Sequence, residues 1–404
     1  SKWLKSLQPA PYIKPILDPN EVKTQYRYWR IRIMYSLFLG YTIFYFTRKS
    51  FTAVAPFIAE DLTLTKGQIG LLGSILYITY GISKFLSGVM ADRSNPRYFM
   101  AYGLMLTGVL NIFFGMSSSL WLLAIFWGLN GWFQAWGWPS CCKSLTYWFN
   151  RQERGLWYSI ASTSHNVGGA LIPVIMVYCA LELGWGWRYA MLVPAFTSIV
   201  MGFVLINRMR DVPKSLGLPE IENRNQEPCA ANEAKHSRLP AKEIILNQVL
   251  NNKFVWIFAL SYFFVYVVRT AVNDWTMFYL PEVKGASEQM AAIAVSGFEI
   301  GGLFGMVVAG WGSDYFFKGN RIPTVVLSAL GMIIAVFGLW NTPYGHAGLD
   351  IFFISLIGFF VYGPQVIVGL AAAEFVDKRA ASAANGFSGT LGYFGAASGC
   401  YLVG

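Results

Sequence analysis

The chain has 404 residues, of which 55% are hydrophobic and 17% aromatic while only 13% are charged, and its mean hydropathy is +0.44. Soluble globular domains carry about a quarter charged residues, so this composition excludes an ordinary soluble enzyme and a soluble nucleic-acid binder. The formal net charge of +10 arises from cations that are spread along the chain. We therefore predict an all-α, polytopic membrane protein.

The first 30 residues hold lysines and prolines but no apolar run of signal-peptide type, so the first span is expected to direct insertion itself. Apolar segments long enough to cross a bilayer, which takes about 20 residues each, then follow as six spans, a polar stretch and five more. They begin near Ile33, Gln68, Phe99, Trp121, Trp157, Tyr189, Phe254, Met290, Thr324, Ile351 and Ala380.

These segments predict an N-terminal cytosolic segment at 1–32, a six-helix bundle at 33–208, a cytosolic loop at 209–252 and a second bundle at 253–404. Because two pseudo-symmetric six-helix bundles would be incomplete with eleven spans, a twelfth helix is expected beyond Gly404.

Lysine and arginine are distributed unequally between the connections. Of the 31, 24 lie before the first span and in every second connection after it, whereas three lie in the opposite connections. The positive-inside rule places the cation-rich side in the cytosol. We expect a multi-pass protein of the bacterial inner membrane with a cytosolic N-terminus.

A weak internal repeat relates the two halves. The first span contains Tyr41, Tyr45 and Arg48 in the pattern Y-x-x-x-Y-x-x-R, and the seventh repeats it with Tyr262, Tyr266 and Arg269. Each arginine is followed by a segment that runs from glycine to aspartate, Gly88 to Asp92 in the first half and Gly310 to Asp314 in the second. The aspartate lies 44 residues after Arg48 and 45 residues after Arg269. Duplications of this kind are typical of transporters whose substrate binds between the halves.

The repeated arginines point to an anion. An arginine at the centre of a membrane helix costs about 2.5 to 3.5 kcal/mol on insertion scales, so two at matched depth are expected to face a shared cavity. Tyr41, Tyr45 and Arg48 share one helical stripe. Guanidinium groups bind phosphate in bidentate geometry, and two of them balance a dianion.

The alternative is that each arginine pairs with an intramembrane acid, Asp274 or Glu299, and only holds helices together. Asp274 is five residues from Arg269, which is about 140° around the helix, so these two do not share a face. Lys84 adds a further cation, and Lys49 is expected on another face in a structural or snorkelling role. Four cations against two acids leave a surplus that a bound anion would neutralise.

His165 lies within the fifth span, where it can satisfy an interhelical bond or donate to a phosphate oxygen. No histidine, cysteine or carboxylate stands at metal-ligand spacing from any of the three histidines, so no metal and no cofactor is expected. The five cysteines show no disulfide pattern. The glycine pairs at 168–169 and 301–302 are expected to allow close helix approach.

The G-x-x-x-D element in the connections after the second and eighth spans resembles the signature of the major facilitator superfamily. It is clear in the first copy and degraded in the second. The alternatives are a topological anchor and a cytosolic gate that pairs in one conformation and releases in the other. The gate residues would be Asp92, Arg93, Arg97, Asp314 and Arg321.

From about Pro11 to Gly404 the sequence resembles the organophosphate:phosphate antiporter family of that superfamily. The resemblance rests on segments 45–49, 83–85, 92–97, 131–139, 165–169, 210–213 and 362–365. It implies that Arg48 and Arg269 bind phosphate with help from Lys84 and His165, and that Asp274 and Glu299 join intramembrane ion pairs. It also implies that the pore is lined by Tyr41, Tyr45, Tyr80, Tyr266, Tyr362 and Tyr393.

Segments 363–365 and 384–387 are more similar to the hexose-6-phosphate carriers and their sensor relatives than to the glycerol-3-phosphate carriers. Sugar hydroxyls would find hydrogen-bond partners in Gln134, Asn166, Gln365 and Asn385, although these amides can equally satisfy the helix backbone. The sequence therefore predicts a monomeric transporter, not an enzyme, that exchanges a sugar phosphate such as glucose 6-phosphate for inorganic phosphate. A sugar-phosphate sensor, a glycerol-3-phosphate antiporter and a membrane phosphatase are the alternatives.

Overall fold

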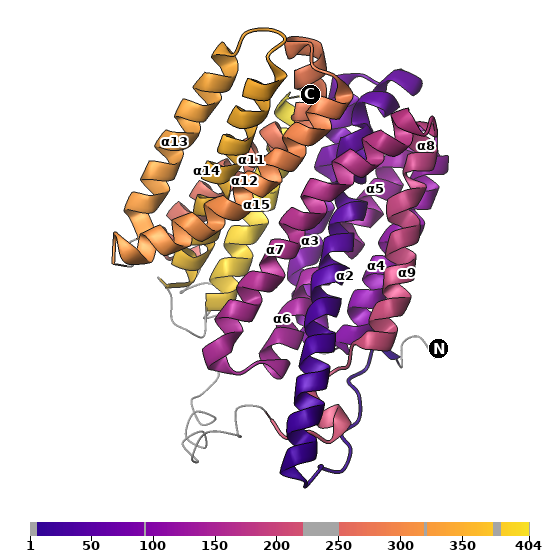
Figure 1. The fold of residues 1–404 in the computed structure, drawn as a ribbon, viewed down its shortest axis with the longest axis vertical. Coiled ribbons are helices and arrows are strands. Elements are labelled where there is room, and N and C mark those ends of the chain that lie inside the picture. The colour runs from indigo at the N-terminus through magenta and orange to yellow at the C-terminus, as the bar shows by residue number, and fades with distance from the viewer. Residues whose placement is uncertain (1–5, 93, 221–249, 319–320, 375–380, 404) are drawn as a thin grey trace.

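The computed structural model describes residues 6–92, 94–220, 250–318, 321–374 and 381–403. These ranges form long helices that run roughly side by side (Figure 1). A π-helical turn, Tyr178–Glu182, extends α7. The helices are α2 (Pro19–Asp61), α3 (Lys66–Asp92), α4 (Pro96–Met116), α5 (Leu120–Gln134), α6 (Gly137–Trp148), α7 (Arg151–Val177), α8 (Gly186–Ala190), α9 (Leu192–Arg208), α11 (Lys253–Lys284), α12 (Glu288–Tyr315), α13 (Arg321–Asn341), α14 (Ala347–Glu374) and α15 (Ala381–Val403).

Every predicted span corresponds to one of these helices or to a consecutive pair. In the described part of the chain, seven helical stretches are long and apolar enough to cross a membrane by length and composition alone. The first two spans, α2 and α3, are not among them. Helices α2 to α9 form one group in Figure 1, and α11 to α15 form the other.

Helix α2 begins well before its apolar segment and extends past the other helices at one end of the molecule (Figure 1). The Asp18 side chain accepts a hydrogen bond from the Asn20 N–H at 2.9 Å, and Pro19 occupies the first turn. Both features favour a helix start. The predicted boundary near Ile33 therefore marks the start of the apolar segment rather than the beginning of the helix.

The fourth span is broken into α5 and α6, which the sequence analysis did not predict. Pro139 has no N–H, so the Ala135 carbonyl four residues earlier lacks a helical partner. The Ser87 hydroxyl of α3 donates to that carbonyl at 2.9 Å, and the Ser83 hydroxyl donates to the Trp132 carbonyl at 2.8 Å. Neighbouring side chains thus satisfy the backbone at the break, as a membrane interior requires.

Burial is inverted relative to a soluble protein. On α13, Val326, Leu330 and Ile333 are 50%, 52% and 63% exposed, whereas Glu299 of α12 is fully buried. Close helix contacts occur at the predicted glycine pairs. A Cβ added to Gly168 would lie 2.4 Å from the Thr42 carbonyl oxygen, and one added to Gly301 would lie 2.1 Å from that of Ser355. The outer surface is thus apolar, and polar groups gather between helices.

Candidate functional site

The two arginines of the internal repeat face one cavity between the helix groups. Arg48 of α2 is 5% exposed and Arg269 of α11 is 8% exposed. The cavity of about 20 Å³ is lined by both arginines and by Tyr45, Lys49, Tyr77, Tyr266, Thr270, Asn273 and Tyr393. A space of this size holds about one water molecule. The structure therefore brings the matched pair together in a closed conformation.

Arg48 is surrounded by aromatic rings. Its Nη1 donates to the Tyr45 hydroxyl at 3.1 Å, and its guanidinium carbon lies 4.0 Å from the Tyr80 ring centroid and 5.7 Å from that of Tyr393. Its Nε and Nη2 atoms are buried without a hydrogen-bond partner in the structure. Buried donors of a charged group are almost always paired in proteins, so these two N–H groups are available to a ligand.

Arg269 is held by a phenol. Its Nη2 donates to the Tyr362 hydroxyl at 2.9 Å, and that hydroxyl donates to Glu299 Oε2 at 2.5 Å. The Arg269 guanidinium also lies 4.6 Å from the Tyr362 ring centroid and 5.3 Å from that of Tyr266. Within the described ranges, neither Arg269 nor Arg48 forms a salt bridge.

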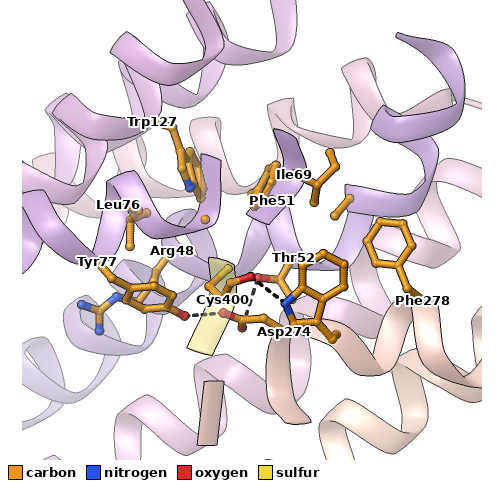
Figure 2. Close-up of a pocket in the computed structure, with 13 residues that line it drawn as sticks. Arg48, Phe51, Thr52, Ile69, Leu76, Tyr77, Trp127, Asp274, Phe278 and Cys400 are labelled. Carbon is orange, nitrogen blue, oxygen red and sulfur yellow. Dashed lines mark hydrogen bonds between the residues drawn. The ribbon is translucent and has the colours of Figure 1, made fainter. Parts of the chain in front are cut away.

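Lys49 provides the link between the halves that the sequence analysis missed. Its Nζ forms a salt bridge with Asp274 Oδ1 at 2.6 Å and donates to Asn273 Oδ1 at 2.6 Å. The Tyr77 hydroxyl donates to Asp274 Oδ2 at 2.6 Å (Figure 2). The predicted 140° separation agrees with this geometry, because Asp274 pairs with α2 rather than with Arg269. Of the two roles considered for Lys49, the structure supports the structural one, because the buried ammonium group is paired rather than directed to solvent.

Glu299 differs from the expected ion pair. Its carboxylate accepts hydrogen bonds from Asn273 Nδ2 at 2.9 Å and Asn166 Nδ2 at 3.1 Å, in addition to the Tyr362 hydroxyl. No salt bridge to Glu299 occurs in the described part of the structure. Three hydrogen bonds to a buried carboxylate replace the cation that the resemblance implied.

These contacts form one chain of hydrogen bonds across the site, which we call the central network. It runs from Asp274 to Lys49, Asn273, Glu299, Tyr362 and Arg269. Asn273 is a member of this network, and the Tyr77 hydroxyl donates to its Asp274. The sequence analysis missed both residues. Only their positions gave a signal: Tyr77 lies one turn from Tyr80, and Asn273 adjoins Asp274.

Several other predicted residues contact the side chains that line this cavity. The His165 ring lies 5.4 Å from that of Tyr45 and 5.8 Å from that of Tyr362, and its Nε2 has no hydrogen-bond partner in the structure. Lys84 Nζ lies 5.1 Å from the Tyr393 ring centroid. Tyr41 lies beside Tyr45, with ring centroids 5.7 Å apart.

The predicted amide residues are not all at the site. Asn166 lies there but binds Glu299. Gln134 satisfies a neighbour in this conformation, because its Nε2 donates to the Thr47 hydroxyl at 2.7 Å, and its ligand role stays a prediction. Gln365 is half-buried and its Oε1 has no partner. The Asn385 side chain lies outside the described residues.

Most of the predicted gate also lies outside the described residues, namely Arg93 and the side chains of Asp92, Asp314 and Arg321. Arg97 Nε donates to the Ile206 carbonyl. A nearby cation that the sequence analysis missed, Lys143 of α6, donates to the Ser94 carbonyl at 2.6 Å and lies 4.0 Å from Asp211. Burial raises the pKa of Asp211, although the Ala10 N–H and Lys143 act against this.

Among the described residues, the hydrogen bonds that join the halves beyond the central network lie on the side of the arginines away from the cation-rich end. The Ser74 hydroxyl donates to the Ala397 carbonyl at 2.7 Å, and the Ser296 hydroxyl donates to that of Ala170 at 2.5 Å. Trp275 Nε1 donates to the Cys400 carbonyl at 3.1 Å. We call this side the outer side, and the structure is closed there.

We expect Tyr362→Phe to weaken phosphate binding about tenfold, because it removes hydrogen bonds to two charged groups, each worth about 1.5 to 3 kcal/mol. Arg269 would lose its orientation, and Glu299 would lose one of three donors. Equilibrium binding of labelled phosphate to purified protein measures the effect. Tyr401→Phe, on an exposed residue, is the control, and equal binding by both variants would contradict the role given to the phenol.

Comparison with known proteins identifies the family. The sequence profile described as Major Facilitator Superfamily matches residues 37–400. The "Probable hexose phosphate transport protein" of Chlamydia trachomatis is 53% identical over all of this chain and 90% of that protein. The "Membrane sensor protein UhpC" of Escherichia coli is 46% identical over 96% of this chain and 88% of that protein.

The "Glycerol-3-phosphate transporter" of Bacillus subtilis is more distant, at 38% identity over 97% of this chain and 89% of that protein. Among solved structures, a bacterial homologue of the human lysosomal transporter Spinster, inward-facing and unoccupied, superimposes with a TM-score of 0.74 at 20% identity. The superposition covers 92% of this chain and 81% of that one. The chain therefore belongs to the major facilitator superfamily and, within it, to the organophosphate:phosphate antiporter family.

Proposed function

We propose that the protein is a secondary active transporter that exchanges a sugar phosphate, in the first place glucose 6-phosphate, for inorganic phosphate. The observation that carries the proposal is the pair of buried arginines at one cavity, neither in a salt bridge among the described residues. Two guanidinium groups without a direct carboxylate partner in a membrane interior are costly, and a phosphate dianion would bind both.

The hexose branch is supported by the 53% identity to a probable hexose phosphate transport protein. Asn166 lies near Tyr362 in space, because both donate to Glu299, and Gln365 is three residues after Tyr362 in the sequence. A sugar hydroxyl would reach both amides after a rearrangement. His165 Nε2 is a further unpartnered buried group beside the cavity. These groups would distinguish a hydroxylated cargo from inorganic phosphate.

Alternating access would use the two halves, 33–208 and 253–404, as rocking bodies about the central site. In the closed cavity the two arginines repel each other. A bound phosphate dianion would screen this repulsion and stabilise the closed cavity, so the empty protein would cross between states slowly and exchange would be strict. We further propose a monomer in the bacterial inner membrane with the cation-rich end in the cytosol.

Proteoliposomes loaded with labelled phosphate test the exchange. We expect efflux to be several-fold faster when phosphate or glucose 6-phosphate is present outside than in buffer alone, because only the loaded protein changes state readily. Protein-free liposomes control for leakage. Equal efflux with and without external substrate would overturn strict exchange.

A second candidate is a sugar-phosphate sensor on the same scaffold, favoured by the 46% identity to a membrane sensor protein. Such a protein binds glucose 6-phosphate but shows negligible turnover in the same liposomes. A third candidate, a glycerol-3-phosphate antiporter, is favoured by the more distant relative. Competition of hexose, triose and glycerol phosphates against labelled phosphate ranks the cargoes in one experiment.

A further inference from the structure

A second cavity, of about 430 Å³, lies at the cation-rich end of the molecule between α2 and the start of α7. Three cations of α2 line it: Lys23, Arg27 and Arg30. They are spaced by three or four residues and therefore share one helical stripe. The cavity is far larger than the central one and falls within the range of small-molecule sites.

The charge of this cavity is only partly neutralised. Arg30 forms a salt bridge with Glu153 at 2.5 Å and lies 4.6 Å from the Phe149 ring centroid. Lys23 and Arg27 are exposed and form no salt bridge with the described residues. The cavity thus keeps a net positive charge at its rim, where an anionic group would bind.

The rest of the lining is apolar and continuous with the membrane-facing surface. Ile31, Met34 and Trp157 line the cavity. Ile31 is 59% exposed, and Tyr35 and Leu39, each four residues further along α2, are exposed as well. Because these three lie along one side of the helix, an apolar strip leads from the cavity along the membrane-facing side of α2.

We propose that this cavity binds the headgroup of an anionic phospholipid, with Lys23 and Arg27 on the phosphate and an acyl chain along Ile31. Arg30 and Arg27 lie three and six residues before the apolar segment that begins near Ile33, and Lys23 lies one turn further out, so the stripe of cations passes through the headgroup region. A sugar phosphate is polar on all sides and would gain no binding energy from contact with the apolar strip. Basic pockets between membrane helices at the cytosolic side bind anionic headgroups in this way.

Thermal unfolding in detergent, titrated with phosphatidylglycerol or with phosphatidylcholine, tests the proposal, because a lipid stabilises only if it binds the native state. The double variant Lys23→Gln/Arg27→Gln should need about tenfold more phosphatidylglycerol for half-maximal stabilisation. Its response to phosphatidylcholine should equal that of the unaltered protein. Ile31→Gln should shift the phosphatidylglycerol response in the same direction with all charges in place.

Arg208→Gln is the matched control, since it removes an exposed cation at the same end of the molecule but outside the cavity. Equal unfolding temperatures without lipid would show that every variant is folded. An unchanged phosphatidylglycerol response in the double variant, or an equal loss in Arg208→Gln, would overturn the proposal. Glycerol phosphate without lipid gives a further test. The proposal would also fail if this compound stabilised the unaltered protein more than the double variant by the same margin as phosphatidylglycerol does.

Discussion

Replacing Arg48 with lysine is expected to weaken phosphate binding about a hundredfold, and Arg269→Lys should do the same. Lysine keeps the charge but loses the planar fork that binds two phosphate oxygens at once. Charge-assisted hydrogen bonds are worth about 1.5 to 3 kcal/mol each, and a net loss of about 3 kcal/mol corresponds to a hundredfold change. Equilibrium binding of labelled phosphate to purified protein measures this loss.

The two variants should differ in stability. Arg48 donates to Tyr45 only and has two nitrogen atoms without a partner, so Arg48→Lys should change the unfolding temperature little. Arg269 is part of the central network through Tyr362, so Arg269→Lys should also lower the unfolding temperature. This difference would show that Arg48 serves mainly to bind the ligand, whereas Arg269 also stabilises the folded site.

Arg208→Lys, on an exposed residue at the end of α9, is the control for the chemical change. Unchanged phosphate affinity in Arg48→Lys or Arg269→Lys would contradict the proposed site. Loss of affinity in one variant alone would assign the phosphate to one guanidinium and leave the other with a structural role.

Much of this site follows from the sequence because its signals are local. The spacing of Tyr41, Tyr45 and Arg48 places them on one helical face, and the repeat places Arg269 at an equivalent depth in the other half. The cost of a buried charge then indicates a shared cavity. The helices themselves follow from runs of apolar residues, and the family resemblance specifies how they pack. The ligand roles of these residues stay predictions.

The partners across the halves could not be predicted in the same way. Lys49 and Asp274 are 225 positions apart, and nothing in either segment alone specifies which cation meets which acid. Tyr362 lies between Arg269 and Glu299 because three helices converge there, which no helical periodicity reveals. The sequence left two roles open for Gln134, because an amide in a membrane span satisfies a neighbouring hydroxyl as readily as a ligand, and the structure shows the bond to Thr47.

Asp274→Asn is expected to open the outer side of the protein. The variant leaves Lys49 buried in the closed state without its counter-charge, and breaking a buried ion pair by removing one partner costs about 3 to 5 kcal/mol. In an outer-open state water would solvate Lys49, so the variant destabilises mainly the closed state. Each 1.4 kcal/mol is tenfold, and the closed-to-open ratio should fall about a hundredfold.

Cys400 is a native probe of this change. It is 4% exposed, and a Cβ added to Gly73 of α3 would lie 2.3 Å from its sulfur atom, so separation of the halves would uncover the thiol. The other cysteines, Cys141, Cys142, Cys179 and Cys229, are first replaced with serine. A membrane-impermeant maleimide should then modify Cys400 much faster in Asp274→Asn than in the parent. An unchanged rate in the folded variant would show that the ion pair does not keep the outer side closed.

Glu282→Gln provides the matched control, because the Lys66–Glu282 pair also joins the halves on the outer side but is about half exposed. Exposed ion pairs contribute about 0 to 1 kcal/mol, so this variant should change the labelling rate only slightly. Lys49→Gln/Asp274→Asn, which removes both charges, should label more slowly than Asp274→Asn because no buried charge is left unpaired. Together the variants test whether burial, rather than the mere presence of an ion pair between the halves, determines how firmly the outer side is closed.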